Sequence, residues 1–436
     1  MSDNRILTTH VGSLIRPDSL LPFLMAKGAG QPFDSAAYER TLKQAVADIV
    51  ARQAEIGIDI VSDGEFGKAL SWSLYGLFRL SGFERREIKG GKNPFARGTD
   101  RDLFPEFYAA IDEVEKSSTW KDAVCTGPIA YSNAGLHEVQ TDISNFKTAL
   151  ASHKKLRGFL PVAATPSVIP DRKNEYYESD DACAEAIGRA MRTEYKAITD
   201  SGLDVQLDDA RIAVTYDRMM PTSTFKDYRR WAAHAVEIIN ASIKGLPREQ
   251  IRYHVCWGSW PGPHVGDVPF KSIVDIVMKI KAGAFALEMG NARHEHEWQI
   301  WKDHKLPDGV KLIPGVVSHQ TNVVEHPELV CERIVRLANL VGRDNVIAGT
   351  DCGFAQVTYL KRVHPSIQWA KLQALVDGAR LATKILWAKK SAAKKATTTK
   401  KVAAKKSPAK RGASKAKAAS PKRAVAKAAK RKASRR

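Results

Sequence analysis

The chain contains no apolar run long enough to cross a bilayer, and residues 1–20 have neither a basic n-region nor an apolar h-region. Cysteine is scarce, odd in number and never arranged as a C-x-x-C pair; the five positions are Cys125, Cys183, Cys256, Cys331 and Cys352. These spacings do not form a disulfide framework. We therefore expect a reduced, cytoplasmic protein that does not associate with membranes.

Acidic and aromatic residues are missing from residues 389–436, which hold 20 of the 68 lysines and arginines. The other 388 residues carry 48 basic and 48 acidic residues, so the formal net charge of +20 lies entirely in this tail. Such a segment cannot bury enough apolar surface to offset its chain entropy, and we predict that it is disordered. Its composition resembles linker-histone tails, which predicts nonspecific, salt-sensitive nucleic-acid binding. A solvated appendage without a partner is the alternative.

The neutral body alternates between strand-like and helical patterns. Nine apolar runs are typical of buried strands: 7–13, 58–62, 123–129, 160–164, 205–208, 251–256, 284–288, 311–318 and 345–350. Helical patterns separate most of them, for example at 37–56, 182–201, 225–244 and 328–341. Because no long linker divides the body, we predict that residues 1–388 form one (β/α)8 TIM-type barrel with insertions. A barrel needs eight strands, so one of these nine then belongs to an insertion.

Three of these strands end in residues that can bind a metal: His254-Val255-Cys256, Glu288 and Cys352. The carboxyl ends of parallel strands meet at one face of a barrel, where active sites assemble. Two thiolates, an imidazole and a carboxylate form a zinc ligand set, and sulfur-rich zinc sites suit chemistry on a thiol. The alternative is chance burial, since free cysteine is among the most buried residue types.

Other strand ends carry polar residues. Ser13 ends the first run, Glu65 lies three residues after the second, and Asp208 ends the run 205–208. Any one of these alone is more often a helix cap or a turn residue. Their repetition at successive strand ends favours a binding site.

Seven short motifs follow one another between about Thr8 and Arg362: Gly12-Ser13, Asp63-Gly64-Glu65, Gln206-Leu207-Asp208-Asp209, His254-x-Cys256, Glu288, Gly315-x-x-Ser318-His319 and Asp351-Cys352-Gly353. Together and in this order, they resemble the catalytic barrel of cobalamin-independent methionine synthase. The resemblance implies that zinc holds the thiol of homocysteine, which takes a methyl group from a folate-type donor. The implied zinc ligands are His254, Cys256, Glu288 and Cys352. The implied substrate-binding residues are Ser13, Glu65 and Asp208, and the implied catalytic residues are His319, a proton donor, and Asp208.

Two other functions remain open. Related barrels use the same zinc ligands on other thiols, for example coenzyme M with an epoxide or a methyl-cobamide donor. A non-catalytic nucleic-acid-associated protein is the third hypothesis, favoured by the tail but not by the neutral body. Glu65 and Asp208 suit the ammonium group of homocysteine, whereas a sulfonate requires Arg or Lys. We interpret residues 294–297, His-Glu-His-Glu, as a solvated helix start, because residues two apart point to different sides of a helix.

The tail prediction is testable by truncation. Removing residues 389–436 is expected to leave the melting temperature of the body unchanged, because the tail shares no core with it. The full-length protein is expected to bind duplex DNA at low salt and to release it as salt rises. Calorimetry and a salt titration of DNA binding check both points, and a truncation that destabilises the body contradicts the boundary at residue 388.

Overall fold

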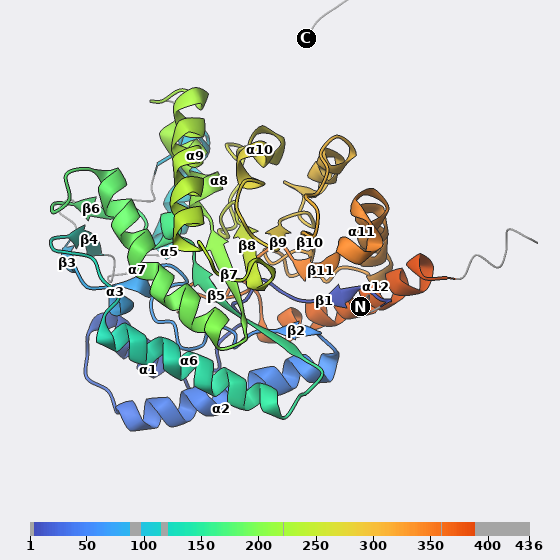
Figure 1. Cartoon of the computed structure of the whole chain (residues 1–436), viewed down its shortest axis with the longest axis horizontal. Coiled ribbons are helices and arrows are strands. Elements are labelled where there is room, and N and C mark those ends of the chain that lie inside the picture. The colour runs from blue at the N-terminus through green and yellow to red at the C-terminus, as the bar shows by residue number, and fades with distance from the viewer. Residues whose placement is uncertain (1–3, 88–96, 115–120, 221, 359, 389–436) are drawn as a thin grey trace, which may run out of the picture. The chain divides into compact units, whose positions relative to one another are not determined.

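The computed structural model describes residues 4–87, 97–114, 121–220, 222–358 and 360–388. Eight parallel strands surround the centre of the body (Figure 1), in the order β1-β11-β10-β9-β8-β7-β5-β2. Their bounds are β1 Leu7–Thr8, β2 Ile60–Val61, β5 Arg157–Ala163, β7 Asp204–Asp209, β8 Ile251–Val255, β9 Ala284–Leu287, β10 Lys311–Val317 and β11 Ile347–Thr350. A parallel bridge between Thr9 and Ile60 joins β1 to β2 and closes the barrel. The predicted TIM-type barrel is confirmed.

Helices cover the outside of the barrel (Figure 1), as expected for strands that are apolar along their whole length. The long ones are α2 Ser35–Ile56, α6 Asn133–Ala151, α7 Asp180–Asp200, α9 Phe225–Ser242, α11 Pro327–Val341 and α12 Pro365–Leu386. Local sequence signals fix their ends. The Asp34 side chain caps the start of α2, and Gly57 ends it in the left-handed conformation. Shorter helices are α1 Leu21–Ala29, α3 Gly76–Arg79 and α10 Val274–Val277.

One of the nine predicted strands, the run 123–129, lies outside the barrel. It is β4, Lys121–Cys125, which pairs with β3, Phe83–Glu87, and β6, Lys173–Asn174, in a separate three-stranded sheet. This sheet belongs to excursions between barrel strands, so the expected insertion is confirmed.

The first strand is shorter than predicted, because the chain leaves the barrel wall after β1. Gly12 adopts a φ of +142°, and a β-carbon there would lie 2.7 Å from Cγ of Pro161. A glycine is therefore required where the chain turns into the barrel mouth, just before Ser13.

A helical insertion, α4 Thr99–Leu103 and α5 Pro105–Val114, packs on the loop that follows β8. The carboxylate of Asp100 accepts hydrogen bonds from the backbone N–H groups of His264 (3.0 Å) and Val265 (2.8 Å) and from the hydroxyl of Tyr108. The insertion therefore forms one wall of the barrel mouth. No helix within the described ranges is long and apolar enough to cross a membrane. The predicted disorder and nucleic-acid binding of the tail concern residues outside these ranges and stay predictions.

Arg79 is the most heavily paired buried cation of the body. Its guanidinium contacts the carboxylates of Glu194, Asp142 and Glu138, and only 2% of its side chain is exposed. The contact links α3 to α6 and α7. Buried charges of this kind stabilise a fold only while each keeps its partners.

Replacing Arg79 is expected to destabilise the body strongly. Arg79→Met leaves the fully buried carboxylate of Glu194 without its guanidinium, which costs about 3–5 kcal/mol of unfolding free energy. Chemical denaturation measures this loss. The matched control is Arg86→Met, whose exposed pairs with Glu84 and Glu175 are expected to contribute little. Equal stability of the two variants would contradict this account of the buried network.

Candidate metal centre and substrate pocket

Three predicted ligands converge at the carboxyl ends of β8 and β11. The ligand atoms of His254, Cys256 and Cys352 lie within 4.8 Å of one another, and all three residues are buried. The two sulfur atoms are 3.5 Å apart, although 96 residues separate them along the chain. An imidazole and two thiols at this spacing suit a thiophilic divalent cation.

The ring of His254 is oriented as a metal ligand requires. Its Nδ1 lies 3.3 Å from the carbonyl oxygen of Ala286 on the neighbouring strand β9. Its Nε2 is buried and has no hydrogen-bond partner among the described residues. A backbone carbonyl that holds one ring nitrogen fixes the tautomer and leaves the other nitrogen for a metal. This orphaned atom therefore fits a bound cation.

The two cysteine thiols differ in their pKa values. Hydrogen bonding from Cys256 lowers the pKa of Cys352 well below its usual range, and the same contact raises the pKa of Cys256. Burial lowers the pKa of His254, but the thiolate of Cys352 outweighs this effect and raises it to about 9. Near neutral pH the cluster therefore holds two protons that a metal-binding set lacks, one on Cys256 and one on His254, and a divalent cation would displace them.

Glu288, the fourth predicted ligand, lies outside the three-residue group. Its Oε1 accepts a hydrogen bond from the backbone N–H of Trp257 at 3.0 Å, and its Oε2 accepts from Asn291 (2.8 Å) and Arg293 (2.9 Å). Burial raises its pKa, but Arg293 and neighbouring histidines outweigh burial and lower it. Glu288 is therefore an ionised carboxylate beside the cluster, held by three donors. Sequence reasoning missed Asn291 and Arg293 as its partners.

Asp351 supports this arrangement from the end of β11. Its Oδ1 accepts hydrogen bonds from the backbone N–H groups of Met289 (2.9 Å) and Gly290 (2.8 Å), and its Oδ2 accepts one from Asn291. The loop after Glu288 is therefore tied to the strand end that carries Cys352. Sequence reasoning placed Asp351 in a motif but assigned it no role.

His319 lies at the end of β10, buried beside the cluster. Neither of its ring nitrogens has a hydrogen-bond partner within the described ranges. Burial lowers its pKa, although the charges of Cys352 and Glu288 oppose this effect. A neutral imidazole with both nitrogens unengaged is available to exchange a proton with a bound molecule.

The predicted substrate residues border a small cavity beside the cluster. Ser13, Glu65 and Asp208 line a space of ≈ 50 Å³, together with His254, Cys256 and Cys352. The structure therefore brings the predicted substrate residues and three of the four predicted metal ligands to one pocket. Trp72 also lines it.

The two carboxylates of the pocket differ in their surroundings. The amine of Lys68 donates to Oε2 of Glu65 at 3.1 Å and to the carbonyl oxygen of Pro161 at 2.6 Å, and Lys68 is only 5% exposed. Asp208 accepts one hydrogen bond, at 2.8 Å, from Gln206. Burial raises the pKa of Asp208 to about 8. Asp208 is therefore the carboxylate that would gain more from a cationic ligand.

Asp209, the next residue, has a structural role. Its carboxylate accepts from the hydroxyls of Ser167 (2.7 Å) and Tyr253 (2.8 Å) and from the backbone N–H of Ile212 (3.1 Å). These bonds hold β7 against its neighbours.

The interpretation of residues 294–297 as solvated is wrong for His294 and Glu297, which are buried, whereas His296 is exposed. His294 is 3% exposed and lies between Asp267 (3.1 Å) and Glu297 (3.2 Å), stacked near the ring of Trp257. Glu295 pairs with Arg333. The run begins a 3₁₀ segment that packs against the barrel. The expectation for a solvated helix, that residues two apart point to different sides, therefore does not hold for these residues.

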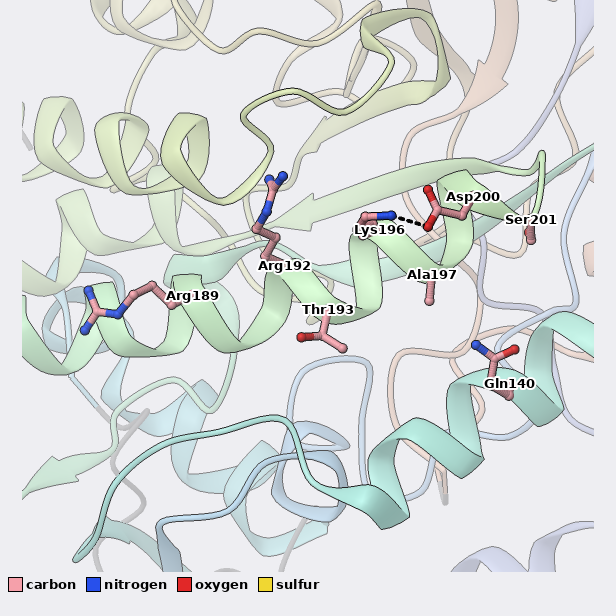
Figure 2. Close-up of a pocket in the computed structure, with 8 residues that line it drawn as sticks. All are labelled: Gln140, Arg189, Arg192, Thr193, Lys196, Ala197, Asp200 and Ser201. Carbon is pink, nitrogen blue, oxygen red and sulfur yellow. Dashed lines mark hydrogen bonds and ion pairs between the residues drawn. The ribbon is translucent and has the colours of Figure 1, made fainter.

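Two further cavities lie outside the substrate pocket, one beside it and one on the outside of the barrel. A cavity of ≈ 240 Å³ opens beside the substrate pocket and shares five lining residues with it: Trp72, Ala210, Gly258, Ser259 and Gln356. A groove of ≈ 570 Å³ lies between α6 and α7 on the outside of the barrel (Figure 2). Figure 2 shows Lys196 of this groove turned to Asp200 of its own helix. None of the groove's lining residues belongs to the metal cluster or substrate pocket, so we assign it no chemistry.

Comparison with known proteins identifies the family. Residues 119–379 match the family described as cobalamin-independent synthase, catalytic domain. The match covers more than half of the chain, and the protein therefore belongs to this family. The resemblance noted from the motifs and the prediction of a methyltransferase-type enzyme are both confirmed.

The curated relatives carry different names. The chain is 26% identical to 2-hydroxypropyl-CoM lyase of Xanthobacter autotrophicus over 84% of its own length and 91% of the relative. It is 25% identical to a methionine synthase of Sulfolobus acidocaldarius over 88% and 94% of the two chains. Among solved structures, a B12-independent methionine synthase from Shewanella aligns with a TM-score of 0.64 at 18% identity, over 88% of this chain and 99% of that one. This structural similarity, at 18% identity, supports the assignment of the barrel fold.

Proposed function

We propose that the protein transfers a methyl group from a folate-type donor to the thiol of homocysteine, with zinc held by His254, Cys256 and Cys352. The observation that carries the proposal is the buried cluster of these three ligand atoms, bordered by Ser13, Glu65 and Asp208. Zinc bound there would supply a Lewis acid that keeps a substrate thiol deprotonated at neutral pH.

Glu288 would complete the metal site when no substrate is present. A catalytic zinc site keeps one exchangeable position, and a carboxylate yields to a thiolate more readily than another thiolate does. Arg293 and Asn291 would hold Glu288 when it is displaced, because they already hydrogen-bond its Oε2. Glu288 would therefore be the fourth residue to hold the metal, and its present donors keep the carboxylate ionised beside the cluster.

The pocket residues would orient the amino acid. Asp208 and Glu65 would face the ammonium group, and the hydroxyl of Ser13 would meet the carboxylate. His319 would relay a proton to the leaving nitrogen of the donor: its lowered pKa keeps the imidazole neutral, so one ring nitrogen would first accept the proton that the substrate thiol loses and would then pass it on.

A second function follows from the relative named 2-hydroxypropyl-CoM lyase. The same metal site would then act on coenzyme M with a short epoxide. The pocket argues against it, since a sulfonate beside Asp208 and Glu65 would meet two carboxylates and one lysine, Lys68, that is already paired.

The metal assignment predicts which substitutions lower the zinc content of the protein. The purified protein is expected to contain about one zinc per chain, and Cys256→Ser or Cys352→Ser is expected to lose most of it, because each removes a thiolate ligand. Glu288→Ala is expected to keep more zinc, since both thiolates and the imidazole remain and water can take the vacant position. Metal analysis after dialysis checks this, with Cys331→Ser on α11 as the control; full zinc in both ligand variants would refute the site.

The substrate assignment predicts a loss of homocysteine binding without loss of metal. Asp208→Asn removes a charge-assisted hydrogen bond to the ammonium group and is expected to cost about 1–3 kcal/mol in homocysteine binding. Kinetics with homocysteine and with coenzyme M, each offered methyl-tetrahydrofolate, methylcobalamin and propylene oxide, measure this effect and identify the product by mass. A wild type that prefers coenzyme M would establish the second function instead.

A further inference from the structure

A fully buried lysine lies on helix α12. The side chain of Lys371 is 0% exposed, and its ammonium lies 2.9 Å and 3.2 Å from the two carboxylate oxygens of Glu325. The ammonium also donates a hydrogen bond to the backbone carbonyl of Val323. Lysine is almost never fully buried unless it is paired. Leu372 and Leu375 of the same helix are equally buried without any such pair.

The stability of the fold does not require this ion pair. Taking two charges out of water is costly, and apolar residues of similar volume often stabilise a protein as well as a buried pair or better. A buried pair can instead fix the position of the segments that it joins. We therefore looked at the segment that carries Glu325.

Glu325 anchors the loop that follows β10. Its Oε1 accepts a hydrogen bond at 2.9 Å from the backbone N–H of Ser318, at the start of the loop. Residues 321–324 lie between these two and are exposed, with Val323 at 69% and Val324 at 41%. None of these four side chains packs into the core to fix the loop. The contacts of Glu325 with Lys371 and with Ser318 therefore determine its path.

His319 lies inside this loop, between two backbone anchors. Its side chain is buried, and neither ring nitrogen has a hydrogen-bond partner within the described ranges. Glu325 holds Ser318, the residue before it. The side chain of Gln320, the residue after it, donates to two backbone carbonyls of the loop that follows β8, at 3.3 Å and 3.2 Å. The ring is therefore positioned through its neighbours in the chain and not through hydrogen bonds of its own.

We propose that Lys371 and Glu325 are positioning residues that hold His319 in place beside the metal cluster. Lys371 fixes the carboxylate of Glu325, and this carboxylate fixes the backbone just before His319. The inference rests on the proposed methyl transfer, in which His319 passes a proton to the leaving nitrogen. Neither Lys371 nor Glu325 lines the substrate pocket, so thiol binding and metal binding are expected not to depend on them.

The test compares two double variants that differ in one hydrogen-bond acceptor. The acceptor-free variant, Lys371→Met with Glu325→Met, leaves the N–H of Ser318 without a partner. In the acceptor-retaining variant, Lys371→Met with Glu325→Gln, the amide oxygen still accepts from Ser318. Both variants lose the whole ion pair, so neither leaves an uncompensated buried charge, and both are expected to fold. The control is Arg229→Met with Asp275→Met, which removes a more exposed pair between α9 and α10.

Methyl transfer from methyl-tetrahydrofolate to homocysteine is measured with the full-length, zinc-loaded protein. The acceptor-free variant is expected to lower kcat about tenfold to a hundredfold, because a misplaced proton-transfer group slows the chemical step. The acceptor-retaining variant is expected to stay close to the control. The KM for homocysteine and the zinc content are expected to match the control in both variants. An acceptor-free variant with the control's kcat overturns the proposal.

Combination with His319→Gln separates positioning from a general disturbance of the barrel mouth. If the ion pair acts through His319, adding the acceptor-free substitutions to His319→Gln is expected to change kcat less than about twofold. A further loss as large as the one in the wild-type background shows that the pair acts elsewhere, and the proposal is then wrong although the proposed function stands.

A wild-type protein that methylates no thiol refutes the proposed function, and nuclear magnetic resonance of ¹⁵N-labelled histidine then decides the positioning. The ring signals of His319 are assigned by their loss in His319→Gln. They are expected to shift in the acceptor-free variant and to keep their wild-type positions in the acceptor-retaining one. Ring signals that are equal in the two variants refute the positioning role.

Discussion

The approach of two buried sulfur atoms, 3.5 Å apart at the ends of β8 and β11, is the constraint on which the rest of the site depends. The barrel order places β9 and β10 between these strands, so the contact reaches across the barrel mouth. Without a metal, the two thiols and His254 hold protons and charges in a buried space. Burying charged groups is unfavourable. The fold therefore maintains a local arrangement that a bound cation would stabilise.

Two aspartates keep this arrangement rigid, and neither contacts the cluster itself. Asp351 accepts three hydrogen bonds from the loop after β9, and Asp209 accepts three that fix the end of β7. Their donors are mostly backbone N–H groups and hydroxyls, so the two carboxylates are satisfied without any ligand. Glu288 resembles these two aspartates, because three donors hold its carboxylate. Asp208 differs from them, because it accepts one hydrogen bond, from Gln206, and lines the substrate pocket.

The sequence predicted the barrel and its strand ends because apolar runs and helical periodicity are local signals. It also predicted that His254, Cys256 and Cys352 lie at or near strand ends, and the structure brings these three residues together. It failed for residues 294–297, where burial against Trp257 decides the environment. Sequence reasoning also missed the pairing of Lys68 with Glu65, although the two are three residues apart, because Glu65 lies in a turn after β2 with a φ of +61° and not in a predicted helix.

The pairing of Lys68 with Glu65 changes how the pocket discriminates between ligands. Two free carboxylates would attract any cation, whereas here the charge of Glu65 is already balanced at 3.1 Å. Asp208 then carries the discrimination, and burial raises its pKa to about 8, so it loses its proton readily only when a positive group arrives. An ammonium ion supplies that group, and its binding and the ionisation of Asp208 favour each other. A ligand without a positive group would leave Asp208 protonated and gain none of this energy, so in the proposed function the selection of an amino acid would depend mainly on this one aspartate.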